Sequence, residues 1–192
     1  MTVPPLLVVC TGNICRSPLA AELVRRATPA AVESYGTAAL EGHAPPRATL
    51  DAARRLGLDL AAHRARQLTV DAVGHAPLVL ALAREHRRAV VSLVPRANRS
   101  TFTLREFARL TRLVDPDDTD RAMASAPDAA VRLQRAVALA AARRGSGRLA
   151  AADEDDVVDP FGCGPEVYAR STAQIVTATN DVAAYLGRAL GA

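Results

Sequence analysis

The residues whose types and spacing could do chemistry lie in one short stretch near the start of the chain. Cys10 is separated by five residues from Arg16, and Ser17 and Pro18 follow directly. A cysteine thiolate is a nucleophile, and an arginine guanidinium can hold two oxygens of a phosphate-like anion. A serine hydroxyl can donate a hydrogen bond to the sulfur. The pattern therefore predicts a loop that binds an oxyanion beside a nucleophilic sulfur.

The residues around this stretch predict a strand before it and a helix after it. Residues 6–9 are continuously apolar, as in a strand covered on both faces, and residues 19–27 follow a helical pattern with Pro18 suited to the first turn. The backbone N–H groups of the loop and the positive end of the helix would then favour both a bound anion and a thiolate at Cys10. The residues expected in this phosphate-binding loop are Thr11, Gly12, Asn13, Ile14, Cys15, Arg16 and Ser17.

The leaving oxygen of a phosphate ester needs a general acid, and Asp159 is the best candidate for this role. It follows the apolar pair Val157-Val158 and precedes Pro160, which makes the local backbone stiff and extended. Asp115 also precedes a proline, and a single Asp-Pro pair is commonly an ordinary turn. A turn without catalytic function therefore remains the alternative for Asp159.

The composition indicates one globular domain over residues 1–192, since 49% of the residues are apolar and the length suits a single core. The net charge is +4, and all 24 basic residues are arginines spread along the chain with few aromatic residues between them. This distribution permits a phosphorylated partner but does not favour a nucleic-acid surface.

The cysteine and histidine content predicts neither a disulfide framework nor a metal site. There are three cysteines, and the four histidines have no ligand-like spacing to one another or to cysteine. We therefore expect no metal and no cofactor. We find no signal-like segment and no run of about 18 apolar residues, so we expect a cytoplasmic protein without membrane insertion.

Apolar runs that alternate with helical patterns predict a parallel sheet with right-handed crossovers. A long helix is expected over residues 166–190, and residues 96–152 are expected to add a helical layer without forming a second domain. The four strands are expected at residues 6–9, 31–35, 76–82 and 89–94.

The motif from Val8 to Pro18 resembles that of the low-molecular-weight protein tyrosine phosphatases almost letter for letter. The late Asp159-Pro160-Phe161 resembles the general-acid motif of that family, and residues 34–37 and 57–68 are similar to its bacterial members. The resemblance covers residues 3–95 and 155–190. It agrees with an α/β three-layer sandwich of the flavodoxin-like, doubly wound type, with a central four-stranded parallel sheet and helices on both faces.

The resemblance implies a role for each principal residue of the site. Cys10 would attack phosphorus to form a phosphocysteine, and Arg16 with the loop amides would hold the phosphoryl oxygens. Asp159 would protonate the leaving group and later accept a proton from water. The implied substrate is a phosphotyrosine protein or a small aryl phosphate, with inorganic phosphate or other oxyanions also binding in the loop.

Two further residues are implied as supports of the loop. Ser34 would brace Asn13, as in the family's Asn–Ser contact. His63 would either brace the same network or be a histidine at the edge of the core.

The second cysteine of the loop, Cys15, has two interpretations of equal weight. It could form a disulfide with Cys10 on oxidation and so protect the nucleophile, or it could be a small packed thiol. Cys163 matches no feature of the family, and we interpret it as incidental.

The chain departs from the family pattern at the rim of the site and in its length. Leu40 stands where the family often has an aromatic wall, and Phe161 follows the Asp-Pro pair; both are expected at the substrate rim. The segment 96–152 is longer than the usual family core. It could act as a lid, a homodimer surface or a site for a kinase or biosynthetic complex, or be an inert elaboration.

Three functions remain open from the sequence. The first is a phosphomonoesterase that prefers phosphotyrosine. The second is an arsenate reductase of the same fold, although a dedicated pair of resolving cysteines after the third strand is missing. The third is a noncatalytic phospho-binding regulator, against which the intact Cys10, Arg16 and Asp159 argue.

Overall fold

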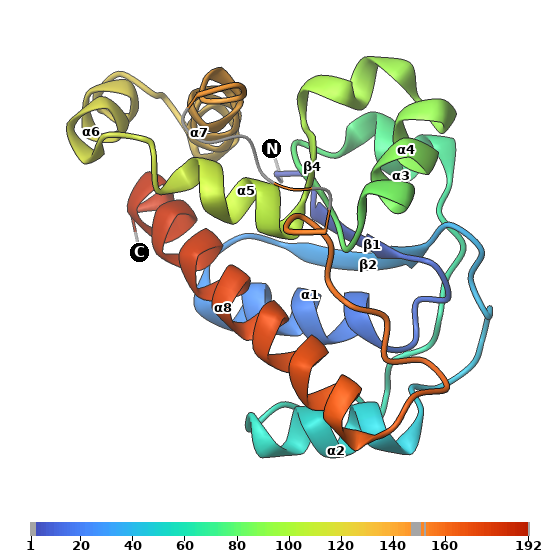
Figure 1. The fold of residues 1–192 in the computed structure, drawn as a ribbon. Helices are drawn as coiled ribbons and strands as arrows, with labels where there is room; N and C mark the ends of the chain where they lie inside the picture. Colours follow the sequence, from blue (N-terminus) through green and yellow to red (C-terminus); the bar gives the residue numbers. More distant parts are fainter. Residues whose placement is uncertain (1–2, 147–150, 152, 192) are drawn as a thin grey trace.

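The computed structural model describes residues 3–146, 151 and 153–191, and a parallel sheet lies at its centre. The sheet has four strands in the order β2-β1-β3-β4, and each neighbouring pair is parallel (Figure 1). This confirms the predicted α/β fold with its four-stranded sheet. The strands are β1 (Leu6–Cys10), β2 (Val32–Gly36), β3 (Val79–Ala81) and β4 (Thr101–Thr103).

Helices cover both faces of the sheet. The helices are α1 (Arg16–Ala27), α2 (Arg47–Arg55), α3 (Val70–His75), α4 (Arg84–Leu93), the 3-10 helix η1 (Pro95–Arg99), α5 (Leu104–Thr111), α6 (Pro116–Ala124), α7 (Ala129–Ala142) and α8 (Pro165–Leu190). In Figure 1, α1 and α8 lie on one side of β1 and β2, and α3 and α4 lie on the other. Among the described helices, none has the length and apolar character needed to cross a membrane.

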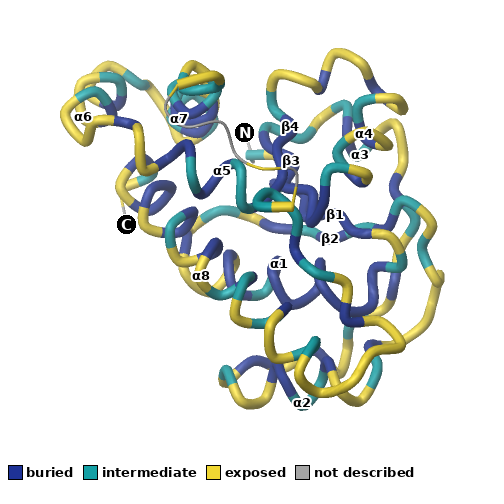
Figure 2. Tube along the Cα trace, viewed as in Figure 1, coloured by how far each residue is buried: buried dark blue, intermediate teal, exposed yellow. Residues whose placement is uncertain are grey.

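The first strand is buried along its whole length because it lies between two helical layers. Leu6 and Val8 pack in a core cluster with residues of α1, α5 and α8, whereas Leu7 and Val9 pack in a second cluster with residues of α3 and α4. Figure 2 shows this burial as a dark strand at the centre of the molecule. Since each fully buried side chain of this size contributes roughly 1.5–3 kcal/mol, the strand is a rigid support for the loop that follows it.

The prediction of the fourth strand at residues 89–94 was wrong. These residues belong mainly to α4, and the true fourth strand, β4, starts seven residues after the predicted segment ends. His86, Val90 and Val94 are buried at helical spacing, so the apolar run marks one face of a helix. β4 has only three residues, with Phe102 between two threonines, and so carries a weak apolar signal.

The segment 96–152 also contributes to the sheet, since it contains β4 and α5. Phe102, Leu104 and Phe107 from these elements are fully buried in the core. The part of the segment outside the sheet layers is the helix pair α6 and α7, which packs against α8. Tyr185 of α8 donates a hydrogen bond to the carbonyl oxygen of Ala136 in α7 at 2.7 Å.

The polar residues 115–120 begin the helix α6. The side chain of Asp115 accepts a hydrogen bond from the backbone N–H of Asp117, and Pro116 occupies the first turn of α6. An aspartate cap followed by proline is a common helix start, which explains why polar residues here are helical.

Gly36, at the end of β2, allows the backbone to approach the loop that follows β1. A Cβ atom at this position would lie 2.4 Å from the carbonyl oxygen of Thr11 and 2.9 Å from Ala39. Because the nearest atom belongs to backbone, the contact could be relieved only by moving the loop. Gly36 therefore sets the distance between β2 and the phosphate-binding loop.

Replacing Gly36 by alanine should lower the free energy of unfolding by about 1–3 kcal/mol, the usual cost of overpacking. Denaturant unfolding measures this change. Gly187→Ala is the matched control, because a Cβ atom there meets no atom within 4 Å. That control should be neutral or more stable by up to about 1 kcal/mol, since alanine favours the helix. Equal stability of the two variants would contradict the assigned role of Gly36.

Candidate active site

A cavity of about 220 Å³ opens where β1 ends and α1 begins. Its lining comes from three parts of the chain: the loop after β1, the turn after β2 and the segment before α8. The structure thus brings together residues that are about 150 positions apart in the sequence. The lining residues are Cys10, Thr11, Gly12, Ile14, Cys15, Arg16, Ala38, Leu40, Asp159 and Phe161.

Cys10 is the last residue of β1, and its sulfur faces a hydroxyl of the next helix. The Cys10 Sγ lies 3.0 Å from the Oγ of Ser17, and both residues are buried. The Ser17 Oγ accepts a hydrogen bond from the Asn13 Nδ2 at 2.9 Å. Because that acceptor position is filled, the serine proton is free to be donated to the sulfur. This arrangement stabilises a thiolate at the N-terminus of α1.

Asn13 holds the loop in an unusual backbone conformation. It has φ 56°, in the left-handed region that asparagine tolerates better than most residues. Its Nδ2 also donates to the Oγ of Ser34 at 3.0 Å, and its Oδ1 accepts from the backbone N–H of Arg66 at 2.8 Å. The contact with Ser34 is the one that the sequence predicted. These bonds tie the loop to β2 and to the segment before α3.

His63 reaches the same residue from another side. Its Nε2 lies 2.8 Å from the carbonyl oxygen of Asn13, which can only accept, so the proton is on Nε2. Burial lowers the pKa of His63, which keeps the ring neutral near pH 7. Of the two interpretations left open for His63, the structure therefore supports participation in the loop network.

Arg16 is the cation of the site, and it is almost fully buried at 4% exposure. Its Nη2 donates to the Oδ2 of Asp159 at 2.7 Å, and its Nη1 donates to the carbonyl oxygen of Val157 at 3.2 Å. The buried Nε has no hydrogen-bond partner within the described residues. A buried guanidinium with an unused donor in the wall of a cavity is suited to an anionic ligand.

An acidic strap, defined here as residues 153–156, carries the chain to Asp159. Asp156 accepts hydrogen bonds from the backbone N–H and the side chain of Arg84, and Asp155 accepts from the side chain of Arg109. These pairs attach the strap to the N-terminus of α4 and to α5. The acidic cluster that was evident in the sequence therefore positions the segment that follows it.

The two residues between the strap and Asp159 are each held by a backbone N–H hydrogen bond. The backbone N–H of Val157 donates to the carbonyl oxygen of Leu82 at 2.8 Å, and that of Val158 donates to the Oε1 of Gln174 at 2.9 Å. Because the two residues that precede Asp159 are anchored, its carboxylate is presented to the cavity even though its side chain is 52% exposed.

Two residues near the loop were not predicted from the sequence. His86, in the first turn of α4, is 2% exposed, and its Nε2 lies 2.8 Å from the Oγ1 of Thr11. Tyr168 of α8 contacts Cys15, with 3.7 Å between Oη and Sγ. The spacing of His86 to Val90 and Val94 could have revealed a buried histidine, but only if that run had been assigned to a helix.

The other two thiols have different surroundings. Cys15 is buried beneath the loop, and burial raises its pKa. Cys163 is exposed, and its sulfur lies near the carbonyl oxygens of Asp159 and Phe161 outside the cavity lining. In the described part of the chain, no three His, Cys, Asp or Glu residues are grouped so that they could hold a metal ion.

The buried His86 predicts a specific pH dependence of stability. Burial, followed by the charge of Arg16, lowers the pKa of His86 from 6.5 to about 4. As the pH falls below about 6.5, the unfolded chain binds the proton before the folded chain does, so stability decreases. Between about pH 7 and pH 4.5 we expect wild type to lose about 2 kcal/mol more than His86→Gln.

Denaturant unfolding across this pH range makes the comparison. The carboxylates and the other histidines titrate in both proteins, so only the difference between them reports on His86. Parallel pH profiles for wild type and His86→Gln would show that the ring is not held neutral in the folded state.

Comparisons with known proteins agree with this geometry. Residues 5–132 match the family model of the low molecular weight phosphotyrosine protein phosphatases. A relative from Ralstonia solanacearum, named a probable low molecular weight protein-tyrosine-phosphatase EpsP, is 37% identical over 134 residues, which are 69% of this chain and 90% of that protein.

Solved structures have the same fold. The YwlE arginine phosphatase from Geobacillus stearothermophilus superposes with a TM-score of 0.66 at 27% identity, covering 94% of this chain and 90% of that one. The tyrosine phosphatase Wzb from Escherichia coli, solved with sulphate, has a TM-score of 0.67 at 21% identity, covering 97% of this chain and 100% of that one. With Cys10, Arg16 and Asp159 around one cavity and residues 5–132 matching the family model, the chain belongs to the low molecular weight phosphotyrosine protein phosphatase family.

Proposed function

We propose that the protein hydrolyses phosphotyrosine in proteins through a phosphocysteine intermediate on Cys10. The observation that carries this proposal is the meeting of Cys10, Arg16 and Asp159 at one cavity. These three side chains supply a nucleophile, a binding site for phosphoryl oxygens and a general acid, which are the groups that the reaction requires.

In the first step, the thiolate of Cys10 attacks the phosphorus atom. A phosphorus–sulfur bond forms while the bond from phosphorus to the tyrosine oxygen breaks. Asp159, in its protonated form, gives its proton to the departing oxygen, so tyrosine leaves as a neutral phenol. The guanidinium of Arg16 and the loop amides hold the phosphoryl oxygens as their charge redistributes.

In the second step, water attacks the phosphocysteine. Asp159, now a carboxylate, accepts a proton from the water, and the phosphorus–sulfur bond breaks to release inorganic phosphate. The thiolate of Cys10 is the leaving group, and the hydroxyl of Ser17, 3.0 Å from the sulfur, stabilises its charge. Asp159 keeps this proton for the next leaving group, or returns it to the solvent when its carboxylate pairs with Arg16 again.

The contact between Arg16 and Asp159 couples substrate binding to the acid. In the ligand-free protein, the Nη2 of Arg16 donates to Asp159 at 2.7 Å. A phosphate in the cavity competes for the same donor and also offers an acceptor to the unpartnered Nε. Substrate binding therefore loosens the pair and frees Asp159 to approach the leaving oxygen.

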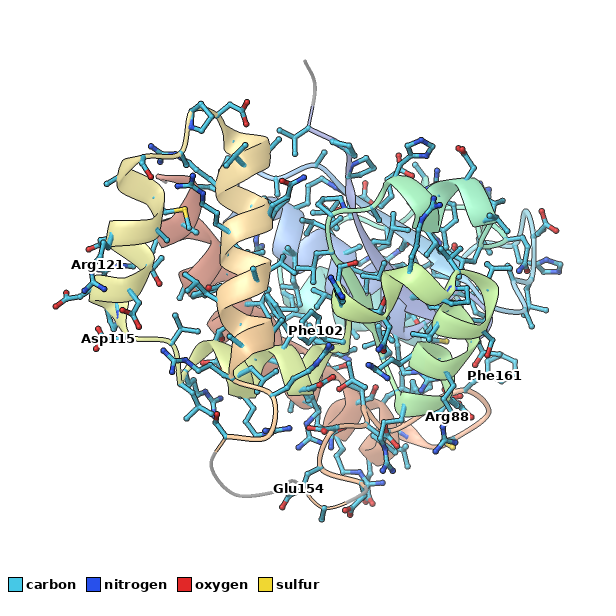
Figure 3. All side chains as sticks on the ribbon, turned by 90° about the horizontal axis from the view of Figure 1, so that it is seen from above. Arg88, Phe102, Asp115, Arg121, Glu154 and Phe161 are labelled. Atoms are coloured by element: carbon cyan, nitrogen blue, oxygen red, sulfur yellow. The ribbon has the colours of Figure 1, made fainter. Side chains whose placement is uncertain are left out.

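The mouth of the cavity favours an aryl group. Leu40 and Phe161 are 41% and 59% exposed, and both line the cavity. Figure 3 shows Phe161 at the periphery of the molecule, where a protein substrate could approach. A phenyl ring that enters the cavity would bury apolar surface against these side chains and Ile14.

One solved structure with the same fold is an arginine phosphatase, so phosphoarginine must be compared with phosphotyrosine as a substrate. A guanidinium in the mouth would need acceptors, and Asp159 is the single carboxylate among the lining residues in the described chain. The charge and the apolar character of the mouth therefore favour phosphotyrosine over phosphoarginine.

The cysteine arrangement does not favour arsenate reduction. Electron relay would require a second thiol that can reach Cys10 and then a third. Cys15 lines the same cavity as Cys10, but Cys163, which would have to serve as the third thiol, is exposed outside the cavity lining. Arsenate is included as a comparison substrate in the experiment that follows, so that this reaction is tested directly.

The direct test is turnover of a panel containing phosphotyrosine, phosphoserine and phosphoarginine peptides, an aryl phosphate and arsenate with a thiol reductant. We expect phosphotyrosine to give the highest kcat/KM and Cys10→Ser to abolish turnover while inorganic phosphate still binds. Cys163→Ser is the matched control and should retain activity, because Cys163 lies outside the lining. Activity in Cys10→Ser, or a preference for another substrate, would refute the proposal.

The role of Asp159 is tested by dependence on the leaving group. Asp159→Asn should lower kcat for phenyl phosphate by roughly two to four decades, as loss of a general acid does. The loss should be smaller for para-nitrophenyl phosphate, whose leaving group needs less protonation. Asp71→Asn, at an exposed position of α3, serves as the control. Equal losses for both esters would show that Asp159 does not act as the acid.

A further inference from the structure

His86 is a buried residue that the proposed mechanism does not use. It is 2% exposed and lies in the first turn of α4, just after the end of β3. Its Nε2 is 2.8 Å from the Oγ1 of Thr11, the residue that follows the nucleophile in the loop and lines the cavity. A buried imidazole thus contacts a hydroxyl in the wall of the anion site.

The surroundings of the ring indicate which nitrogen carries the proton. The Nδ1 of His86 is buried and has no partner among the residues described. An unpartnered buried N–H is rarer than an unpartnered acceptor, so the proton belongs on Nε2. The Oε1 of the exposed Glu85, 3.4 Å from Nε2, is a second acceptor for this proton and supports the same tautomer.

The charged groups around the ring favour its neutral form. Arg16 opposes a second positive charge, whereas Asp159, Asp156 and Glu85 favour one. Burial is the largest effect and also opposes the charge, so the net shift of the His86 pKa is downward. The ring is therefore a neutral donor at Nε2.

The consequence concerns the proton of Thr11. When the Nε2–H of His86 donates to the Thr11 Oγ1, it occupies an acceptor position of the hydroxyl. The hydroxyl proton is then free to be donated elsewhere, and Thr11 lines the cavity that also holds Cys10 and Arg16. The same contact links the loop to α4, an element on the opposite sheet face from α1.

We propose that His86 is a positioning residue that fixes the hydroxyl of Thr11 as a hydrogen-bond donor to a phosphoryl oxygen in the cavity. Thr11 touches the substrate in this scheme, and His86 acts through it. The inference rests on the proposed function in that the bound group is the phosphoryl group of the substrate. It adds a side-chain donor to the loop amides and Arg16.

A structural role alone would have a different signature. If His86 only packs α4 against the loop, its replacement lowers stability and activity regardless of Thr11. If it acts through the Thr11 hydroxyl, the effect of replacing His86 disappears once that hydroxyl is gone. A double-mutant cycle separates the two cases.

The variants are His86→Leu, His86→Gln, Thr11→Val and the double variant with Leu and Val. Glutamine can place an N–H near the position of Nε2, whereas leucine cannot; valine has the shape of threonine without the hydroxyl. The readouts are the Kd for inorganic phosphate, measured in the Cys10→Ser background, and kcat/KM for an aryl phosphate. Thermal unfolding of each variant identifies any that fail to fold.

We expect Thr11→Val and His86→Leu each to weaken phosphate binding and to lower kcat/KM by about tenfold, the usual effect of losing one hydrogen bond to a charged group. The double variant should be no worse than Thr11→Val, and His86→Gln should recover most of the loss. His75→Leu, at an exposed position of α3, is the control and should match wild type.

Three results would each overturn the inference. The first is a loss in the double variant equal to the product of the two single losses. The others are equal losses in His86→Gln and His86→Leu, or no loss in Thr11→Val. Phosphate binding keeps this result separate from the proposed function. If the protein hydrolysed none of the phosphoesters but phosphate affinity followed the expected cycle, the proposed function would fail and the inference about His86 would stand. Thr11→Val tests the inference even if the variants at His86 do not fold.

Discussion

The pairing of Arg16 with Asp159 is the interaction on which the site depends, because it joins two segments that lie 143 positions apart in the sequence. Arg16 begins α1, after the loop that follows the first strand, and Asp159 lies two residues after Val157, whose backbone N–H is bonded to Leu82 of the segment after β3. The guanidinium is buried and also bonds the carbonyl oxygen of Val157. A buried cation without an anion would be costly, so the pair stabilises the fold, while the Arg16 Nε has no partner among the described residues.

The rest of the fold holds this pair and Cys10 in fixed relative positions. Cys10 is the last residue of the buried β1, which fixes its position. The bonds of Asn13 to Ser17 and Ser34 hold the turn of the loop. On the other side, the acidic strap attaches Asp159 to α4 and α5 through Arg84 and Arg109. The strap explains why an exposed aspartate can still be presented in a defined direction.

Under the proposed function, substrate choice depends on a different part of the molecule from the chemistry. In that proposal, the groups that bind and transfer phosphate belong to the loop and to Asp159, whereas the exposed Leu40 and Phe161 form an apolar mouth of the cavity. The helix pair α6 and α7 packs on α8, and none of its residues lines the cavity. It extends the layer that includes α1 and α8 and does not cover the mouth.

The sequence by itself indicated the phosphatase family, the parallel α/β fold and the site residues Cys10 and Arg16, whereas an ordinary turn remained the alternative for Asp159. It could do so because the loop is local: the strand, the turn with Asn13 and the helix start are encoded by neighbouring residues. It failed for the fourth strand, since Val90 and Val94 read equally well as a strand or as one helix face, and β4 is too short to carry a pattern. Only the tertiary structure showed that the same helix face brings His86 to Thr11, because contacts over 75 positions depend on packing and not on local sequence.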